Sequence, residues 1–385
     1  MKMKTKILTF GLLALSLVCG GCKSVLIPED KPLVLDQRSW LSSASQNDIE
    51  ILAYEAIGTG SVQDISYDGS TLLILNPTQT TPVSYNVDLL RFTEEGNRLT
   101  SFLSSEKSQV AAAFDPYAQG IFYVEETDAE NSPVAKQLVW TSIDKSTTRT
   151  ISSQEESVNA AFYTISDSQV LYTDSSRSLI FADANGRHEV YSTTYNLDIQ
   201  QVAYLPESQT VLYTAKSPSD ENKTNLYRSE LKAGETVLTS ALIDENVLDF
   251  DLNADSGLLF YIKLNGSSRE MMRCNVNNYS TPTAIAKGNF TSVTATASGD
   301  QVLFSEYSST NSKSSQSIWI MDSNGKNQLQ ITAPLTLTSE IIAHPYKSTI
   351  YFSAEKSPGD EDLSPDKGGG KGGTPTVFKI DYNIK

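Results

Sequence analysis

Residues 317–332, SIWIMDSNGKNQLQIT, contain the pattern that decides the fold. Large apolar side chains alternate with other residues in SIWIM, a polar Asp-Ser-Asn-Gly segment follows, and QLQIT alternates again. Alternation with a period of two is typical of a strand with one buried face, and Asn-Gly is common in tight hairpin turns because both residues tolerate positive φ. The stretch therefore predicts a β-hairpin that turns at Asn324-Gly325.

A related unit precedes this hairpin and recurs along the chain. In each copy an alternating stretch leads through a short polar turn into a strongly apolar stretch. The seven copies are VQDISYDGSTLLIL (62–75), QVAAAFDPYAQGIFYV (109–124), SVNAAFYTISDSQVLYT (157–173), IQQVAYLPESQTVLYT (199–214), VLDFDLNADSGLLFYI (247–262), FTSVTATASGDQVLFS (290–305) and TSEIIAHPYKSTIYFS (338–353). Their starts lie 42 to 48 residues apart, a spacing typical of propeller blades and too long for leucine-rich or ankyrin repeats.

Further strand-like stretches follow each copy, for example LIFADANGRHEVYST (179–193) and NLYRSELKAGETVLT (225–239). Four strands per unit is the composition of a propeller blade. The second strand of each unit is apolar throughout because blades pack face to face and bury both of its faces. The sequence therefore predicts an all-β fold, a seven-bladed β-propeller, with six blades as the alternative count.

The last unit is short of one strand. After residue 353 only one further strand is evident, TVFKIDYNI (376–384), whereas NDIEILAYEAIG (48–59) is a strand-like stretch that precedes the first unit. Exposed sheet edges invite aggregation. We therefore expect 48–59 to close the ring by pairing with the last blade, with Ile49, Ile51 and Leu52 supplying apolar contacts.

The N-terminus has the features of a signal peptide. MKMKTK is basic, and ILTFGLLALSLV (7–18) is apolar but too short to span a bilayer comfortably as a helix. The following VCGGC resembles a bacterial lipobox, which implies that Cys22 is acylated; Cys19 departs from the usual Leu, and cleavage near Gly20 or Gly21 by ordinary signal peptidase is the alternative. Lys23 in place of Asp resembles the sorting state for the outer membrane.

These features define the expected organisation. Residues 1–21 form a lipoprotein signal peptide, 22–46 a lipidated tether and 47–385 the propeller domain. The expected location is the cell outer membrane, with the protein lipid-anchored and facing the periplasm or the cell surface. The 46 acidic and 30 basic residues give a net charge of -16, which argues against nucleic acid as a partner. Contact with the membrane is expected through the N-terminal lipid, and an unidentified envelope protein is the expected partner.

Catalytic constellations are scarce. There is no G-x-S-x-G motif, and His188 and His344 are the only histidines, so a triad or a multi-His metal site is difficult to assemble. His188 falls on an outer strand of the third unit and His344 on an inner strand of the seventh, so the two should be far apart. Cys274 has no partner cysteine in the mature chain and is interpreted as an inert apolar filler.

No catalytic residue, metal site or cofactor is therefore predicted. The acidic loop PGDEDLSPD (358–366) has carboxylates that could gather around calcium, but it lacks the EF-hand order and is interpreted as solvated. Pairs of carboxylates for glycoside chemistry stay open, because 46 acids offer many pairs and no spacing singles one out.

The sixth unit carries a family resemblance. SGDQVLFSEYSSTNSKSSQSIWIMDSNGKNQLQIT (298–332) resembles the WD40-like repeat of TolB-like propellers, in which a Ser-Pro-Asp-Gly-like turn precedes an apolar strand and an Ile-Trp-x-Met-Asp hairpin ends in Leu-Thr. The motif is weaker in other units, and the resemblance covers roughly residues 60–385. TolB itself has six blades, lacks a lipid anchor and carries a preceding α/β domain, so the resemblance implies a binding scaffold rather than TolB's partner.

The function predicted from these observations is a non-catalytic interaction scaffold in the cell envelope, not an enzyme. The alternative is a propeller enzyme, a lyase or a glycosidase, acting on polysaccharide. Oligogalacturonate lyases resemble the seven-bladed architecture, but they rely on a His-rich metal centre for which two histidines are too few. An enzyme should show charged side chains converging at one mouth of the central channel, whereas a scaffold should show broad loop surfaces. The long second-to-third connections, 126–136, 216–224, 307–316 and 355–375, are the predicted binding surface.

Overall fold

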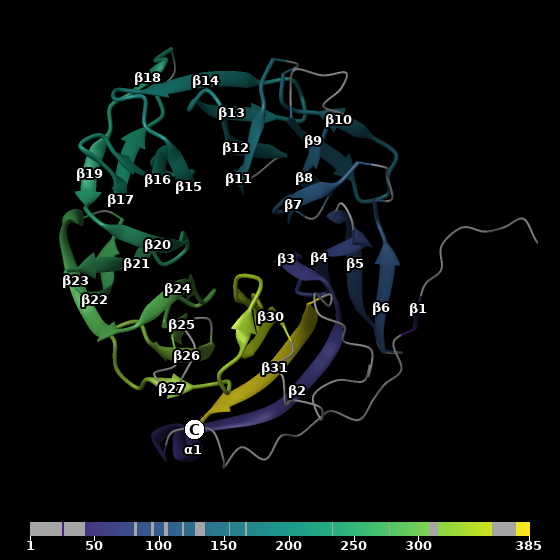
Figure 1. Cartoon of the computed structure of the whole chain (residues 1–385), viewed down its shortest axis with the longest axis vertical. Helices are drawn as coiled ribbons and strands as arrows, with labels where there is room; N and C mark the ends of the chain where they lie inside the picture. Colours follow the sequence, from purple (N-terminus) through teal and green to yellow (C-terminus); the bar gives the residue numbers. More distant parts are fainter. Residues whose placement is uncertain are drawn as a thin grey trace, which may run out of the picture.

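Seven β-sheets, antiparallel except for one parallel strand pair at the outer edge of the third, stand side by side around a common axis in the order of the chain (Figure 1). The computed structural model describes residues 25–26, 43–80, 83–93, 96–103, 107–117, 119–127, 135–153, 155–165, 168–232, 234–276, 278–307, 315–355 and 375–385. The arrangement is a seven-bladed β-propeller, which confirms the predicted fold class and the count of seven.

The first four blades have their strands in chain order from the axis outward. The first contains β3 (Ser61–Ile65), β4 (Thr71–Thr80), β5 (Val83–Thr93) and β6 (Gly96–Ser101), with β1 (Val25–Leu26) paired to β6. The second contains β7 (Gln109–Phe114), β8 (Gly120–Glu126), β9 (Lys136–Ser142) and β10 (Thr148–Thr150). The third contains β11 (Val158–Thr164), β12 (Gln169–Asp174), β13 (Leu179–Asp183) and β14 (His188–Thr193), with β18 (Val237–Leu238) at its edge. The fourth contains β15 (Ile199–Leu205), β16 (Thr210–Ser217), β17 (Asp220–Glu230) and β19 (Ala241–Asp244).

The remaining blades continue the ring, and the last one uses both ends of the propeller domain. The fifth contains β20 (Val247–Asn253), β21 (Leu258–Asn265), β22 (Ser268–Asn275) and β23 (Asn278–Gly288). The sixth contains β24 (Phe290–Ala295), β25 (Gln301–Tyr307), β26 (Gln316–Asp322) and β27 (Leu329–Gln330). The seventh contains the short β28 (Thr336–Leu337) and β29 (Ile342–Ala343), then β30 (Thr349–Glu355), β31 (Thr376–Ile384) and β2 (Ile49–Thr59).

The second strand of each blade is buried on both faces, as its uniform apolar sequence predicts. In β16, Val211 and Tyr213 pack into a cluster shared with blade 3, whereas Leu212, which points to the other face, packs into a cluster shared with blade 5. Successive side chains of a strand point to opposite faces. Each second strand therefore joins its blade to both neighbours, and the core is a closed series of interblade clusters.

The predicted closure of the ring by an N-terminal strand is confirmed. β2 pairs with β31 in antiparallel register from Ile49 opposite Ile384 to Thr59 opposite Thr376, and the two long strands run side by side in Figure 1. Ile49 and Ile51 are buried in a cluster with residues of blades 6 and 7. Leu52 is 53% exposed, so its expected apolar contact is wrong: the pleat turns it to solvent while its neighbour Ile51 faces the core.

Two short elements lie before β2. Val25 pairs with Leu99 at the outer edge of blade 1. Helix α1 (Ser43–Asp48) leads into β2, and its Ser45 hydroxyl accepts a hydrogen bond from the backbone N–H of Gln330 at 2.6 Å. No helix in the described part of the chain is long and apolar enough to cross a membrane.

The hairpin of residues 317–332 is present in blade 6, where β26 and β27 form the two outer strands. Gly325 has φ of +83°, and its N–H donates to the carbonyl of Asp322 at 2.8 Å. A Cβ at this position would lie 2.0 Å from the carbonyl oxygen of Ile285. Glycine is therefore required here both by the backbone conformation and by the close approach of blade 5.

Candidate functional site

Carboxylates on inner strands join neighbouring blades. Asp251 on β20 accepts a hydrogen bond from the backbone N–H of Ala295 on β24 at 2.8 Å and another from Leu252 at 2.8 Å. Asp64 on β3 does the same with the N–H groups of Phe114 on β7 and of Ile65, both at 2.8 Å. The inner strand of a blade has an edge whose N–H groups would otherwise lack protein partners. Each aspartate therefore holds the next blade in place.

A second aspartate two residues earlier adds to this contact in blade 5. Asp249 accepts hydrogen bonds from the N–H of Val293 at 2.9 Å and from the side-chain amide of Gln201 on β15 at 2.7 Å. Asp249 and Asp251 lie on the same face of β20 because the side-chain period of a strand is two residues. Blades 4, 5 and 6 are thus connected through one carboxylate.

A third carboxylate reaches the same place from blade 7. Thr294, between the two residues that donate to these aspartates, donates its hydroxyl to the carbonyl of Ile341 at 3.1 Å. This bond holds the segment before β29 against β24 and brings Glu340 close enough to Asp249 and Asp251 for their charges to act on it. We call Asp249, Asp251 and Glu340 the axial carboxylate cluster, since their segments belong to the inner edges of blades 5 and 7 (Figure 1).

Glu340 differs from the two aspartates in having an unused carboxylate. Its side chain is exposed, and within the described residues it has no hydrogen-bond or ion-pair partner. Although the side chain reaches solvent, the segments around it remove part of its hydration water, and this loss, followed by the like charges of Asp249 and Asp251, raises the pKa of Glu340 to about 7. The group is solvent-accessible and therefore also accessible to a ligand.

The aspartates of the cluster are perturbed in the same direction. Burial raises the pKa of Asp251 to about 6 against the opposing effect of its two N–H donors, and burial also raises the pKa of Asp249. A carboxyl group whose pKa lies near neutrality can both release and accept a proton at that pH, which is the property that general acid–base chemistry requires. The cluster is therefore chemically suited to proton transfer.

Three tyrosine rings lie near acidic side chains of blade 5. Tyr163 on β11 has its pKa raised to about 12 by burial and then by the charges of Asp251 and Asp255. Tyr67 and Tyr346, on the first turns of blades 1 and 7, are 69% and 61% exposed and pack edge to face with ring centroids 5.7 Å apart. The charge of Asp255 also acts on Tyr346, so both sets of rings lie near the first turn of blade 5.

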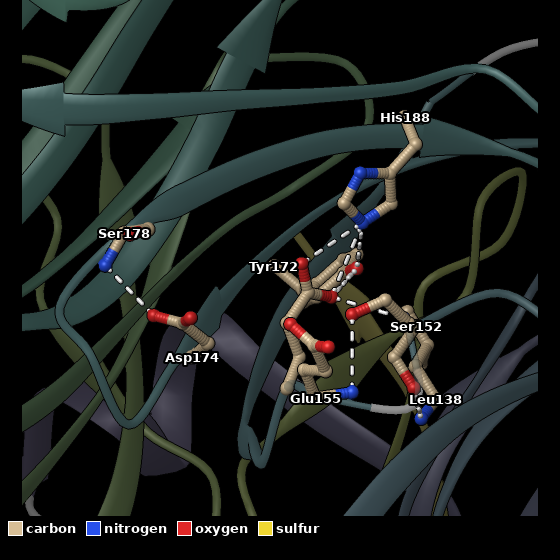
Figure 2. Close-up of polar contacts among 9 residues, drawn as sticks. Leu138, Ser152, Glu155, Tyr172, Asp174, Ser178 and His188 are labelled. Atoms are coloured by element: carbon tan, nitrogen blue, oxygen red, sulfur yellow. Dashed lines mark hydrogen bonds and ion pairs between the residues drawn. The ribbon is translucent and has the colours of Figure 1, made fainter.

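A separate polar group occupies the linker between blades 2 and 3 (Figure 2). The hydroxyl of Tyr172 on β12 donates to Glu156 at 2.8 Å, and Nε2 of His188 lies 3.0 Å from the other oxygen of Glu156. Loss of hydration and the charge of Glu156 raise the pKa of Tyr172 strongly. His188 lies on the outer strand β14, where the sequence predicted it.

The same arrangement recurs in blade 5 without a histidine. Tyr261, at the equivalent position of β21, donates to Asp244 at 2.9 Å, and Nζ of Lys263 lies 2.5 Å from Asp244. In both blades a buried tyrosine and a basic side chain hold an acidic residue of the segment that enters the blade. Because Lys263 takes the place of the imidazole, we interpret the contacts among Glu156, Tyr172 and His188 as structural rather than catalytic.

The structure places the other residues that the sequence singled out as follows. Cys22 and the acidic loop 358–366 lie outside the described residues, and so do most residues of the connections 126–136, 307–316 and 355–375. Cys274 is buried on β22, where burial raises the pKa of its thiol to about 11. His344 lies beside β29, in blade 7, far around the ring from His188 in blade 3.

The expected long loop in unit four is wrong. The ladder between β16 and β17 continues outward through Lys216 opposite Thr224 to Ser217 opposite Asp220. The polar side chains of this segment suggested a loop, but backbone pairing depends on N–H and C=O groups rather than on side-chain polarity. The segment is therefore an extended hairpin.

The sequence analysis did not identify the axial carboxylate cluster. One available indication was the pair Asp249 and Asp251, because two acids at alternate positions of a predicted inner strand must share a face. Glu340 gave no comparable indication. Among the described residues, no group of three or more His, Cys, Asp or Glu side chains is arranged to hold a metal ion.

No protein-family model and no curated protein matches the sequence. Solved structures match in fold. An oligogalacturonate lyase from Vibrio parahaemolyticus superposes with a TM-score of 0.63 and 12% identity, over 87% of this chain and 98% of that one. An oligogalacturonate lyase in complex with manganese superposes with 0.61 and 12%, over 86% and 92%. TolB from Acinetobacter baumannii matches with 0.48 and 15%, over 70% and 65%.

These comparisons correct the predicted function. The propeller fold implied by the TolB-like repeat is confirmed by the seven blades. The interpretation as a non-catalytic scaffold, and with it the conclusion that the chain is not an enzyme, is contradicted, because two structures that match over most of both chains, with TM-scores of 0.63 and 0.61, are oligogalacturonate lyases. That interpretation rested on the absence of a known catalytic motif, and such an absence does not exclude an enzyme. The alternative, a propeller enzyme acting on polysaccharide, agrees better with these findings.

Proposed function

We propose that this protein is a polysaccharide-cleaving enzyme whose acid–base chemistry is carried by the axial carboxylate cluster. The observation that carries the proposal is the position of Glu340, an accessible carboxyl group that has no hydrogen-bond or ion-pair partner among the described residues and lies near two half-buried aspartates of an inner strand. Charged side chains converging near the axis are also the feature that distinguishes an enzyme from a scaffold in this architecture.

Hydrolysis of a glycosidic bond needs two carboxyl groups in different protonation states. Glu340, with its pKa near 7, holds a proton part of the time at neutral pH and donates it to the glycosidic oxygen as the bond to the anomeric carbon breaks. Asp251, whose pKa of about 6 leaves it mostly ionised at neutral pH, accepts a proton from the attacking water, whose hydroxyl bonds to the anomeric carbon. The ionised aspartate also stabilises the positive charge that develops on the sugar.

The charge of the site favours hydrolysis of a neutral polysaccharide over elimination from a uronide. Within the described residues none of the three carboxylates has an ion-pair partner, and the whole chain carries a net charge of -16. An acidic substrate would therefore be repelled unless a cation intervened. The exposed rings of Tyr67 and Tyr346 offer apolar faces on which an uncharged sugar ring can stack.

The location proposed for this activity is the cell envelope. The lipobox-like VCGGC supports acylation at Cys22 after removal of residues 1–21, and Lys23 supports sorting to the outer membrane. A lipid-anchored enzyme would act on polysaccharide in the periplasm or at the cell surface. Cys22→Ala should shift the protein out of the membrane fraction, because a spanning helix is not expected to hold it there.

The activity is tested by incubating the purified protein with a panel of neutral polysaccharides and one polyuronide. Release of reducing ends reports cleavage, and ultraviolet absorbance of an unsaturated product separates elimination from hydrolysis. Glu340→Gln, which keeps the shape of the side chain but removes the proton, should lower the rate of cleavage by roughly 10²-fold to 10⁴-fold. Glu207→Gln, at an exposed turn of blade 4, is the matched control and should leave the rate unchanged.

Two results would reject the proposal. One is the absence of cleavage of every polysaccharide in the panel by the wild-type protein. The other is cleavage by Glu340→Gln at the wild-type rate, which would place the chemistry elsewhere in the ring.

A further inference from the structure

A pocket of about 680 Å³ lies at the seam where blade 7 meets blade 1. One wall is the first turn of blade 1, around Gly69, and the opposite wall is the first turn of blade 7, around Lys347. β31 supplies further lining residues, among them Lys379 and Asp381. We call this the seam pocket. Its volume is within the range of sites for small-molecule ligands.

The acidic groups of the seam pocket already have partners. Both oxygens of Asp68 accept hydrogen bonds from the hydroxyl of Ser70, and one of them also accepts from that residue's N–H at 3.0 Å. Asp381 accepts from the hydroxyl of Thr349 at 2.6 Å and pairs with Lys379 at 2.7 Å. These carboxylates are held within the protein, so they do not require a cation from outside.

Two unused polar groups of the pocket are hydrogen-bond donors. Lys347 has an exposed side chain with no hydrogen-bond or ion-pair partner among the described residues. His344 is 6% exposed, and its Nδ1 accepts a hydrogen bond from the N–H of Tyr346 at 3.0 Å. In the neutral ring the proton is therefore on Nε2. That nitrogen makes no hydrogen bond to any side chain or backbone group among the described residues, although the residue is buried.

Gly69 allows this donor to lie at the pocket wall. Its φ is +70°, and a Cβ at this position would lie 2.3 Å from Nε2 of His344. A side chain would therefore collide with the edge of the imidazole that carries the free N–H. Burial and the charge of Lys347 lower the pKa of His344, which favours the neutral ring with this proton arrangement.

We propose that the seam pocket binds a small anionic sugar, a polyhydroxyl compound that carries a carboxylate or a phosphate. Lys347 pairs with the anionic group, and Nε2–H of His344 donates to an oxygen of the ligand. The satisfied carboxylates Asp68 and Asp381 accept hydrogen bonds from the sugar hydroxyls with their remaining lone pairs. This site is separate from the axial carboxylate cluster, which offers acids rather than donors, and the inference does not depend on the proposed function.

Binding in the seam pocket should stabilise the closed ring, because the pocket walls belong to the first and last blades. A ligand that contacts both walls binds only the closed ring and shifts the folding equilibrium toward it. The ligand should therefore raise the melting temperature in proportion to the logarithm of its concentration once it exceeds the dissociation constant.

The experiment uses the full-length protein with four probes: glucuronate, glucose 6-phosphate, glucose and inorganic phosphate. Isothermal titration and thermal unfolding should both detect glucuronate or glucose 6-phosphate and not glucose. The two charged sugars distinguish a carboxylate from a phosphate as the preferred anion. Lys347→Gln should weaken binding of the preferred probe at least about tenfold, as expected for loss of a charge-assisted contact. Lys326→Gln, an exposed lysine in the turn of blade 6, is the matched control.

Three results would overturn the inference. They are the failure of both charged sugars to bind, equal binding of glucose and the charged sugars, and unchanged binding after Lys347→Gln. Inorganic phosphate that binds as tightly as glucose 6-phosphate would also reject the sugar and leave a simple anion site. None of these results affects polysaccharide cleavage, so the two proposals can fail separately.

Discussion

Asp64 in blade 1 and Asp251 in blade 5 make the same local contacts in different surroundings. Each accepts its neighbour's N–H and one from the next blade, and burial raises the pKa of each to about 6. Asp251 has Asp249 and Glu340 beside it, whereas the pKa of Asp64 is shifted only by burial and by its own hydrogen bonds. The contact between blades therefore accounts for both aspartates, but it does not account for Glu340.

The comparison shows why a buried carboxylate is weak evidence of a catalytic site. A perturbed pKa arises wherever a charge is removed from water, and Asp64 has one for structural reasons. The distinguishing feature of the blade 5 region is an additional acid, Glu340, whose carboxylate makes no hydrogen bond or ion pair with the described residues and is accessible to a ligand. The predictions below separate these two roles.

The largest effect is expected from deleting β2, which opens the ring that contains the blade contacts of both Asp64 and Asp251. A chain that begins at Gly60 lacks β2 and the buried side chains of Ile49, Ile51 and Tyr54. Burying each such side chain contributes roughly 1.5–3 kcal/mol, so the free energy of unfolding should fall by more than about 4 kcal/mol. Urea unfolding of the two chains measures this difference in the free energy of unfolding.

The matched control for this deletion is a chain that begins at Ser43 and keeps both α1 and β2. It should unfold at the same urea concentration as the full-length protein. An unchanged midpoint for the chain that begins at Gly60 would show that the first and last blades hold together without β2.

A smaller effect is expected from replacing each aspartate by its amide. Asp64→Asn and Asp251→Asn both present an NH₂ group to a backbone N–H, and loss of one buried acceptor costs about 1–3 kcal/mol. Only Asp251→Asn should also slow polysaccharide cleavage, because it removes a charge beside Glu340. Asp300→Asn, at an exposed turn, is the control for both measurements. Equal loss of activity in the Asp64 and Asp251 variants would erase the distinction between the two regions.

The smallest effect concerns pH. A carboxyl group with a raised folded-state pKa stabilises the protein below its unfolded pKa, and this stabilisation is lost as the pH rises through the folded value. For Asp64 and Asp251 the loss occurs up to about pH 6, and for Glu340 up to about pH 7. Stability should therefore decline across this window in the wild-type protein.

Glu340→Gln isolates the contribution of one group. Relative to the wild type, the variant should gain thermal stability between about pH 5 and about pH 8, because it no longer acquires a charge beside Asp249 and Asp251. The difference is expected to be modest, since the side chain is exposed and solvent screens it. A constant difference across this range would mean that Glu340 is not repelled by the two aspartates.

Much of the fold could be predicted because it depends on short sequence patterns, such as alternation and turn motifs. Alternation along 317–332 predicted β26 and β27, Asn324-Gly325 predicted the turn, and the missing last strand predicted the pairing of β2 with β31. The extended hairpin of β16 and β17 could not be predicted from its polar side chains. Leu52 was misassigned because its apolar type was counted as buried, although alternation from Ile49 and Ile51 already points the side chain of residue 52 to solvent.

The sequence by itself determined the repeat, the number of blades and the strand that closes the ring, because periodicity and apolar burial act over a few residues and recur in every unit. Only the tertiary structure decided the candidate site. Glu340 meets Asp249 and Asp251 because Thr294 in blade 6 ties the segment before β29 to the strand whose N–H groups hold both aspartates. Residues from blades 5 and 7 become neighbours only when the ring curves around its axis. No repeating pattern in the sequence indicates which residues this curvature brings together.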